Sequence, residues 1–241
     1  MPGIFYTPGF PPGVKWLLIS NVAVFLLGYF AGLLQLDRPL AYLALRPTLV
    51  TSGYIWQLVT YLFLHGGFSH IIWNMLGLWM FGADLERLWG TRRFVEFYFV
   101  CGIGAGICVV LCNYLLPWGN PAVPTIGSSG AIFGILLANA VLFPDRTILW
   151  GFLIPIQMKW FVLIIGTIAF ISSFQVNTGV SEFAHLGGML FGYLWLKKPR
   201  STGSFDLIGP LQRQYQRWKV ERAKKKFQVY LKKQGRDPWV H

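Results

Sequence analysis

Charged side chains are scarce in this sequence. Asp, Glu, Lys and Arg make up 12% of its 241 residues, whereas hydrophobic residues make up 54% and aromatic residues 17%. The mean hydropathy is +0.50. About a quarter of the residues of a typical soluble domain are charged, so this composition excludes a soluble globular domain. The sequence instead predicts an all-α polytopic membrane protein.

Cysteine is also scarce, and the acidic residues do not pair. The three cysteines, Cys101, Cys108 and Cys112, lie within one apolar run, where small apolar filler is their expected role. Cys108 and Cys112 share one face of a predicted helix, but no further Cys or His nearby completes a metal set. The sequence has no His-Glu-x-x-His pattern and no pair of Asp residues within its apolar runs. We therefore expect no metal and no cofactor, and catalysis by a zinc ion or by a pair of aspartates is excluded.

Long apolar windows mark the predicted membrane spans. The fifth window is interrupted by Pro155 and Lys159, so its helix is expected to begin near Met158, after an interfacial lead-in at 149–156. The first window has no clear signal peptidase site and is expected to remain as a span. The six predicted spans are 14–34, 68–85, 94–116, 126–143, 150–172 and 183–197.

The distribution of positive charge predicts the orientation of the chain. With a cytoplasmic N-terminus, 19 of the 21 Lys and Arg residues fall on the inside, and Arg38 and Arg46 fall outside. Positive charge concentrates on the cytoplasmic side of membrane proteins, so both termini are predicted to be cytoplasmic. A prokaryotic plasma (inner) membrane is the expected location of such a compact chain.

Three regions are expected: a short cytoplasmic N-terminus (1–14), a six-span domain (15–196) and a basic cytoplasmic tail (197–241). The tail holds 13 basic and 3 acidic residues, which account for most of the formal net charge of +12. The high net charge is therefore not evidence of nucleic-acid binding, and no nucleic-acid partner is expected. A basic tail after a span is typical of segments that contact anionic lipid. An amphipathic helix at about 211–231 would suit that surface.

The stretch Thr-Ile-Gly-Ser-Ser-Gly-Ala-Ile-Phe-Gly, from Thr125 to Gly134, places Ser129 beside glycine at the start of an apolar run. Serine often caps the unpaired N–H groups of a helix start, and small residues let membrane helices approach closely. A structural role is therefore one interpretation of Ser129. The other is a nucleophile, because His185, in a second glycine-bearing run, supplies the base that a serine nucleophile needs.

Small residues predict that these two runs pack closely. They recur at every fourth position: Gly130 and Gly134 in the first run, and Ala184, Gly188 and Gly192 in the second. Such faces let helix backbones come close. Ser129 and His185 lie at matching depth, so we expect the serine hydroxyl within hydrogen-bond reach of the imidazole.

A second polar pair precedes these runs. His70 and Asn74 are four residues apart, so they share one helix face. A polar residue in a span commonly bonds a neighbouring helix. Beside a candidate nucleophile, the pair has a second interpretation as donors to a developing oxyanion.

Together these patterns resemble the rhomboid family of intramembrane serine proteases. They are His70-x-x-x-Asn74, Gly127-x-Ser129-Gly130 and Ala184-His185-x-x-Gly188, in the family's order on the second, fourth and sixth predicted spans. The resemblance covers roughly residues 15–196. It implies a six-transmembrane-helix rhomboid-like bundle around a water-filled cavity that opens outward. It also implies substrates that are transmembrane proteins, cut near the outer membrane boundary.

The resemblance implies a role for each matching residue. Ser129 is the implied nucleophile, and His185 is the implied general base and then acid. The implied oxyanion donors are His70, Asn74 and the backbone N–H of Ser129, and the implied packing residues are Gly127, Gly130, Phe133 and Gly188. No Asp or Glu is in an evident position to orient the imidazole, which suits a Ser-His dyad. The implied flexible cap runs from Ser173 to Glu182, and the fifth span is where substrate would enter sideways.

Two departures from the family pattern concern the surroundings of the dyad. Trp56-Gln57 stands where many members have Trp-Arg in the long outside loop, and this bears on how the loop is anchored. Phe133 stands where some members have Tyr, so a hydroxyl is absent there.

Two other functions are compatible with a membrane bundle. A catalytically silent rhomboid-like protein that binds membrane clients typically lacks the Ser or the His, and both are present here. A small transporter or channel needs polar groups along a path through the bilayer, whereas the polar groups here cluster at the outer end.

Overall fold

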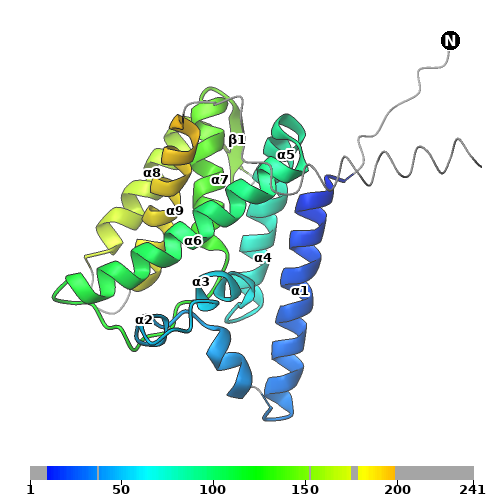
Figure 1. The fold of residues 1–241 in the computed structure, drawn as a ribbon. Helices are drawn as coiled ribbons and strands as arrows, with labels where there is room; N and C mark the ends of the chain where they lie inside the picture. The colour runs from blue at the N-terminus through cyan, green and yellow to red at the C-terminus, as the bar shows by residue number, and fades with distance from the viewer. Residues whose placement is uncertain (1–9, 37, 152, 175–178, 199–241) are drawn as a thin grey trace, which may run out of the picture. The chain divides into compact units, whose positions relative to one another are not determined.

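The computed structural model of the protein describes residues 10–36, 38–151, 153–174 and 179–198. The described chain is mostly helical (Figure 1). Its longer helices are α1 (Pro12–Leu33), α4 (Phe68–Gly77), α5 (Ala83–Trp89), α6 (Thr91–Leu115), α7 (Ser129–Leu142), α8 (Met158–Ser172) and α9 (Gly179–Lys197). A π-helical turn, η3 (Leu78–Gly82), joins α4 to α5. The predicted tail helix at 211–231 lies outside the described residues.

The helices follow the predicted apolar runs. Among the described residues, α1 and α6 are long and apolar enough to cross a membrane, and α7 and α8 are shorter apolar helices. The run at 68–85 contains α4 and η3 and ends within α5. α8 begins at Met158, as the sequence predicts. α9 begins at Gly179 rather than near 183, so the last part of the predicted cap is helical. Residues 175–178 of that cap lie outside the described residues.

A two-stranded hairpin lies between α7 and α8, where the sequence predicts an interfacial lead-in. Strands β1 (Thr147–Trp150) and β2 (Ile154–Gln157) are antiparallel, and Ile148 pairs with Ile156. Gly151 lies in the turn with a φ of +59°, a conformation that favours glycine. Pro155 is disfavoured in a helix interior but tolerated in an edge strand. The all-α expectation is therefore corrected at this hairpin.

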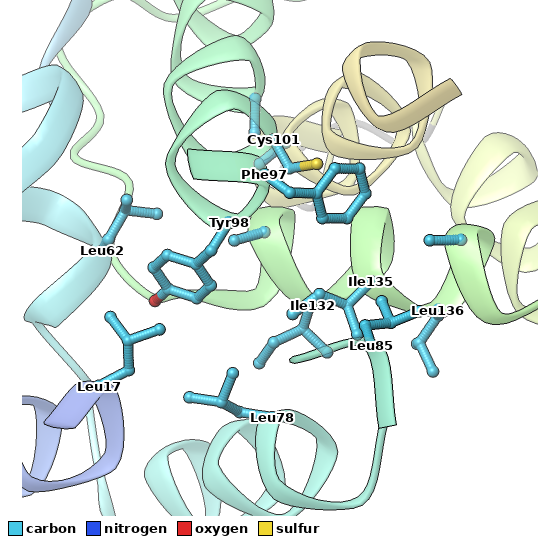
Figure 2. Close-up of a cluster of buried hydrophobic side chains, with 14 of the residues drawn as sticks. Leu17, Leu62, Leu78, Leu85, Phe97, Tyr98, Cys101, Ile132, Ile135 and Leu136 are labelled. Carbon is cyan, nitrogen blue, oxygen red and sulfur yellow. The ribbon is translucent and has the colours of Figure 1, made fainter. Parts of the chain in front are cut away.

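The core forms where α6 and α7 meet the N-terminal helices. Figure 2 shows part of this buried cluster, with side chains from several elements. They include Phe97, Tyr98 and Cys101 of α6, Ile132, Ile135 and Leu136 of α7, and Leu17, Leu78 and Leu85 of α1, η3 and α5. α6 also packs tightly against α9, as Gly104 shows, where an added Cβ would lie 2.1 Å from Cγ of Phe191. The helices that bear the site are thus held by direct packing.

One buried carboxylate joins the start of α1 to α5 and α6. Glu86 is 3% exposed. Its two oxygens accept the backbone N–H groups of Gly13 and Val14, each at 2.7 Å, and its Oε1 also accepts the Thr91 hydroxyl at 2.7 Å. A helix start has N–H groups without intrahelical acceptors, and α1 has no side-chain cap from its own N-cap residue. Glu86 therefore supplies that cap from a distant part of the chain.

The long loop before α4 is anchored by a glutamine. The loop contains four short helical segments: η1 (Arg38–Leu43), α2 (Pro47–Thr51), α3 (Gln57–Thr60) and η2 (Tyr61–Phe63). The Gln57 side chain is fully buried. Its amide donates to the Tyr42 carbonyl at 2.9 Å and accepts the Arg46 N–H at 3.0 Å. A glutamine thus holds the two sides of the loop together at the position where the sequence departs from the Trp-Arg pattern.

Candidate active site

The structure brings Ser129 and His185 into contact. Ser129 is the first residue of α7, and His185 lies in the second turn of α9. The Ser129 Oγ lies 2.9 Å from His185 Nε2. Both side chains are partly buried. A serine hydroxyl at this distance can donate its proton to a neutral imidazole nitrogen.

Glycines set the spacing between the two helices that carry this pair. A Cβ at Gly188 would collide with the backbone carbonyl of Gly130. A Cβ at Gly130 would lie 2.6 Å from the Cβ of Ala105 on α6 and 3.1 Å from the carbonyl oxygen of Ala184. The backbones of α7 and α9 therefore approach without intervening side chains. This contact places the hydroxyl and the imidazole at the same level.

The imidazole of His185 is fixed on its face by Phe133. The two ring centroids are 4.1 Å apart and the ring planes differ by 4°. Phe133 lies one turn after Ser129 on α7, so the same helix that provides the hydroxyl also provides this stacking surface. Stacking leaves the ring nitrogens free to form hydrogen bonds in the ring plane.

The other ring nitrogen contacts a carboxylate, contrary to the expectation that no acidic residue is placed to orient the ring. His185 Nδ1 lies 2.9 Å from Glu182 Oε2. An ionised carboxylate can only accept, so Nδ1 carries the hydrogen and Nε2 is left as the acceptor for the serine. The sequence holds a signal for this contact in the three-residue spacing of Glu-Phe-Ala-His on one helix face.

His70 and Asn74 lie beside this pair, on α4. The Asn74 amide donates to the His70 carbonyl at 2.8 Å and accepts the Ser128 hydroxyl at 3.2 Å. Ser128 is the N-cap residue of α7, but its side chain makes no capping bond. The buried Ser128 hydroxyl thus joins α7 to α4.

The contacts of His70 fix its tautomer. The Gly66 N–H donates to His70 Nδ1 at 3.3 Å, so the hydrogen of the neutral ring lies on Nε2. That nitrogen faces the backbone of Gly127, where a Cβ would lie 2.7 Å from it. Gly127 also has a φ of +113°. Both the backbone conformation and the approach of the ring require glycine at this position.

A second histidine packs against His70 just before α4. The ring centroids of His65 and His70 are 5.0 Å apart. Burial, together with the nearby His70, lowers the pKa of His65 to about 4, and a backbone hydrogen bond at Phe63 opposes the shift. His65 is therefore neutral at physiological pH. It adds no positive charge beside the candidate oxyanion donors.

A cavity of about 590 Å³ opens beside the pair. It lies between α4 and η3 on one side and α8 and the β1–β2 hairpin on the other. The polar part of its lining lies at one end and consists of Ser129, His185, His70 and Asn74. The rest of the lining is mostly apolar and includes Trp73, Met80, Phe81, Ile132, Leu149, Trp150 and Phe161. The cavity can therefore hold an apolar chain segment next to the Ser129 hydroxyl and the His185 imidazole.

Comparison with known proteins agrees with the resemblance seen in the sequence. The rhomboid domain family model matches residues 52–198. The chain is 32% identical over 178 residues to rhomboid protease GluP of Bacillus subtilis (strain 168), covering 74% of this chain and 32% of that protein. It is 31% identical over 148 residues to the putative rhomboid protease YdcA of the same organism, covering 60% of this chain and 67% of that protein.

A eukaryotic relative shows a similar level of identity. Rhomboid protein 1, mitochondrial, of Saccharomyces cerevisiae is 30% identical over 201 residues, covering 81% of this chain and 56% of that protein. The matched part therefore spans about a third of GluP and just over half of the yeast protein. The family model covers more than half of this chain and includes every helix of the candidate site. The chain belongs to the rhomboid family of integral membrane proteins, which includes rhomboid proteases.

Proposed function

We propose that this protein is an intramembrane serine endopeptidase that cleaves transmembrane helices near the outer membrane boundary. The observation that carries the proposal is the 2.9 Å contact between Ser129 Oγ and His185 Nε2, at the polar end of an apolar cavity. Relatives named as proteases support the same reaction class. Ser129 is the proposed nucleophile, and His185 is the proposed general base and acid.

The proposed reaction proceeds in two halves. The Ser129 oxygen attacks the carbonyl carbon of the substrate while its proton passes to His185 Nε2, and the carbonyl oxygen becomes an anion. The C–N bond then breaks, and Nε2 returns the proton to the leaving amine, which leaves an acyl-serine. Water attacks this ester in the same way, releases the carboxylic acid product and restores the serine.

The oxyanion donors proposed are the Ser129 N–H, His70 and Asn74. The Ser129 N–H belongs to the first turn of α7, where backbone N–H groups have no intrahelical acceptor. His70 carries its hydrogen on Nε2, and the Asn74 amide has a second hydrogen beyond the one it donates to the His70 carbonyl. Donors fixed in advance in this way stabilise a developing negative charge. Gly127, Gly130, Phe133 and Gly188 are the proposed packing residues.

The proposed topology has six spans and both termini in the cytoplasm. Positive charge supports it, because 19 of 21 Lys and Arg residues then lie inside. A prokaryotic plasma membrane is the proposed location, and anionic lipid is the proposed partner of the basic tail. In this arrangement substrate helices enter the cavity between α4 and α8.

The first test is labelling with a fluorescent fluorophosphonate, which reacts with serine nucleophiles that a base activates. We expect labelling of the detergent-solubilised wild type, and loss of labelling in Ser129→Ala and His185→Ala. Ser52→Ala is the matched control, because Ser52 is exposed and its hydroxyl donates to the Thr48 carbonyl. It should label as the wild type does.

Cleavage of a model transmembrane substrate completes the test. Wild type and Ser52→Ala should cleave it, and Ser129→Ala should not. Labelling or cleavage by Ser129→Ala at the wild-type rate would overturn the proposal. So would a folded wild type that neither labels nor cleaves, which is the behaviour of a client-binding relative.

A further inference from the structure

The Glu182 carboxylate is placed on the side of the imidazole that faces away from the serine. Glu182 lies in the first turn of α9, three residues before His185, and its Oε2 is 2.9 Å from Nδ1. The side chains of His185 and Glu182 are 16% and 22% exposed. The two-residue mechanism above assigns no role to this contact.

We propose that Glu182 is a positioning residue that turns the Ser129–His185 pair into a charge-assisted relay of three groups; this rests on the function proposed above. The carboxylate accepts the Nδ1 hydrogen, so Nε2 is the free base. When Nε2 takes the serine proton, the ring becomes a cation with an anion 2.9 Å away. Hydrogen bonds to charged partners are roughly twice as strong as neutral ones. The carboxylate therefore stabilises the charged ring more than the neutral ring.

Among the groups that contact the His185 ring, Glu182 is the one that carries a negative charge. Phe133 stacks on the face of the ring, and the Ser129 hydroxyl contacts Nε2. Across the cavity, the nearby ionisable group is His70 of α4, which interacts electrostatically with His185. Within the described ranges, no other carboxylate forms a hydrogen bond or ion pair with the ring.

The other neighbouring helices contribute little charge. Cys101 and Cys108 are the thiols of α6 that approach α9, at Gly192 and Gly187 respectively. α8 carries Lys159, whose ammonium pairs with Asp145. The electrostatic environment of the ring is thus set mainly by the Glu182 carboxylate.

A purely structural role predicts a different outcome. An acidic residue in the first turn of a helix favours the helix through its dipole, and an i, i+3 pair adds slightly to the stability of a helix surface. If this were the whole role, replacing Glu182 would lower stability and leave the kinetics of folded protein unchanged. The kinetic constants of folded enzyme therefore separate the two roles.

The test replaces Glu182 by Gln in the whole chain and measures kcat and KM on a model transmembrane substrate. Glutamine keeps the length and an acceptor oxygen but lacks the charge. We expect kcat to fall about tenfold, the difference between a charged and a neutral hydrogen bond, with KM unchanged. Glu96→Gln, at an exposed carboxylate on α6, is the matched control and should match the wild type.

Two further variants make every outcome decisive. Glu182→Asp keeps the charge with a shorter reach, so it should retain more activity than Glu182→Gln, and it serves as the test if Glu182→Gln fails to fold. Folded Glu182 variants with wild-type kcat would overturn the relay. Ser129→Ala, measured alongside, separates the proposals: inactive Ser129→Ala with unaffected Glu182 variants refutes the relay alone, whereas active Ser129→Ala refutes the protease mechanism itself.

Discussion

Single residues decide whether the candidate site can form, and Gly127 shows this most directly. Its φ of +113° is unfavourable for any residue with a Cβ, and a Cβ there would also lie 2.7 Å from His70 Nε2. The two effects are separable, because Gly53 has a similar φ of +101° but no atom within 4 Å of a Cβ.

We therefore expect Gly127→Ala and Gly53→Ala to lose similar stability but differ in activity. Each substitution places a Cβ in the left-handed region, which costs about 1 kcal/mol. Only Gly127→Ala displaces His70, so its cleavage rate should fall by more than tenfold, as expected for loss of an oxyanion donor. Thermal unfolding and cleavage of the model substrate measure the two effects. Equal activity of the two variants would contradict the placement of His70.

The sequence predicted the contact between Ser129 and His185 but not the contact with Glu182. Small residues at every fourth position indicate the close packing of two helices, and this spacing is visible in the sequence. The sixth predicted span begins at residue 183, just after Glu182, because a charged residue interrupts the hydrophobic pattern. The helix itself begins earlier, at Gly179. Helix starts are poorly defined by hydrophobicity, so a polar first turn was assigned to the cap.

At the scale of elements, a helix start that has no cap in its own segment is capped by a side chain from a distant part of the chain. α1 begins without a side-chain cap of its own, and Glu86 of α5 accepts the N–H groups of Gly13 and Val14. The hairpin at 147–157 was likewise not predicted. Its strands are apolar at almost every position, as a membrane helix is, so alternation could not identify them.

We expect Glu86→Gln to destabilise the bundle by about 3 kcal/mol. Glutamine presents an NH₂ group in place of one carboxylate oxygen, and this group faces a backbone N–H that needs an acceptor. The midpoint of denaturant unfolding in detergent measures the loss. Glu96→Gln, exposed on α6, should change stability by less than about 0.5 kcal/mol. An unchanged midpoint in Glu86→Gln would show that the α1 cap contributes little.

For the whole molecule, composition alone identified a helical membrane protein, while the number of crossings remains a prediction. Two of the described helices meet the length and hydropathy expected of a span, and α7 and α8 are shorter. Short helices can still cross where they line a cavity within the bundle. Ser129, at the start of α7, lines the cavity.

We expect reporter proteins fused to the two termini to show that both termini lie in the cytoplasm. A fluorescent protein fused at either end should fold and fluoresce, and alkaline phosphatase at the same positions should be inactive. Phosphatase inserted at Ala122, in the exposed connector between α6 and α7, is the opposite control and should be active. Phosphatase activity at either terminus would contradict the six-span topology.

The shape of the cavity has a consequence for inhibitor chemistry. Its polar groups lie at one end, near Ser129, and its mostly apolar walls include Trp150 and Phe161. A compound with a small serine-reactive group and a rigid apolar tail would bury the tail along these walls. A compound of equal size with a polar tail would lose hydration without gaining hydrogen bonds. Selective inhibitors of this protein should therefore combine a small serine-reactive group with a lipophilic tail.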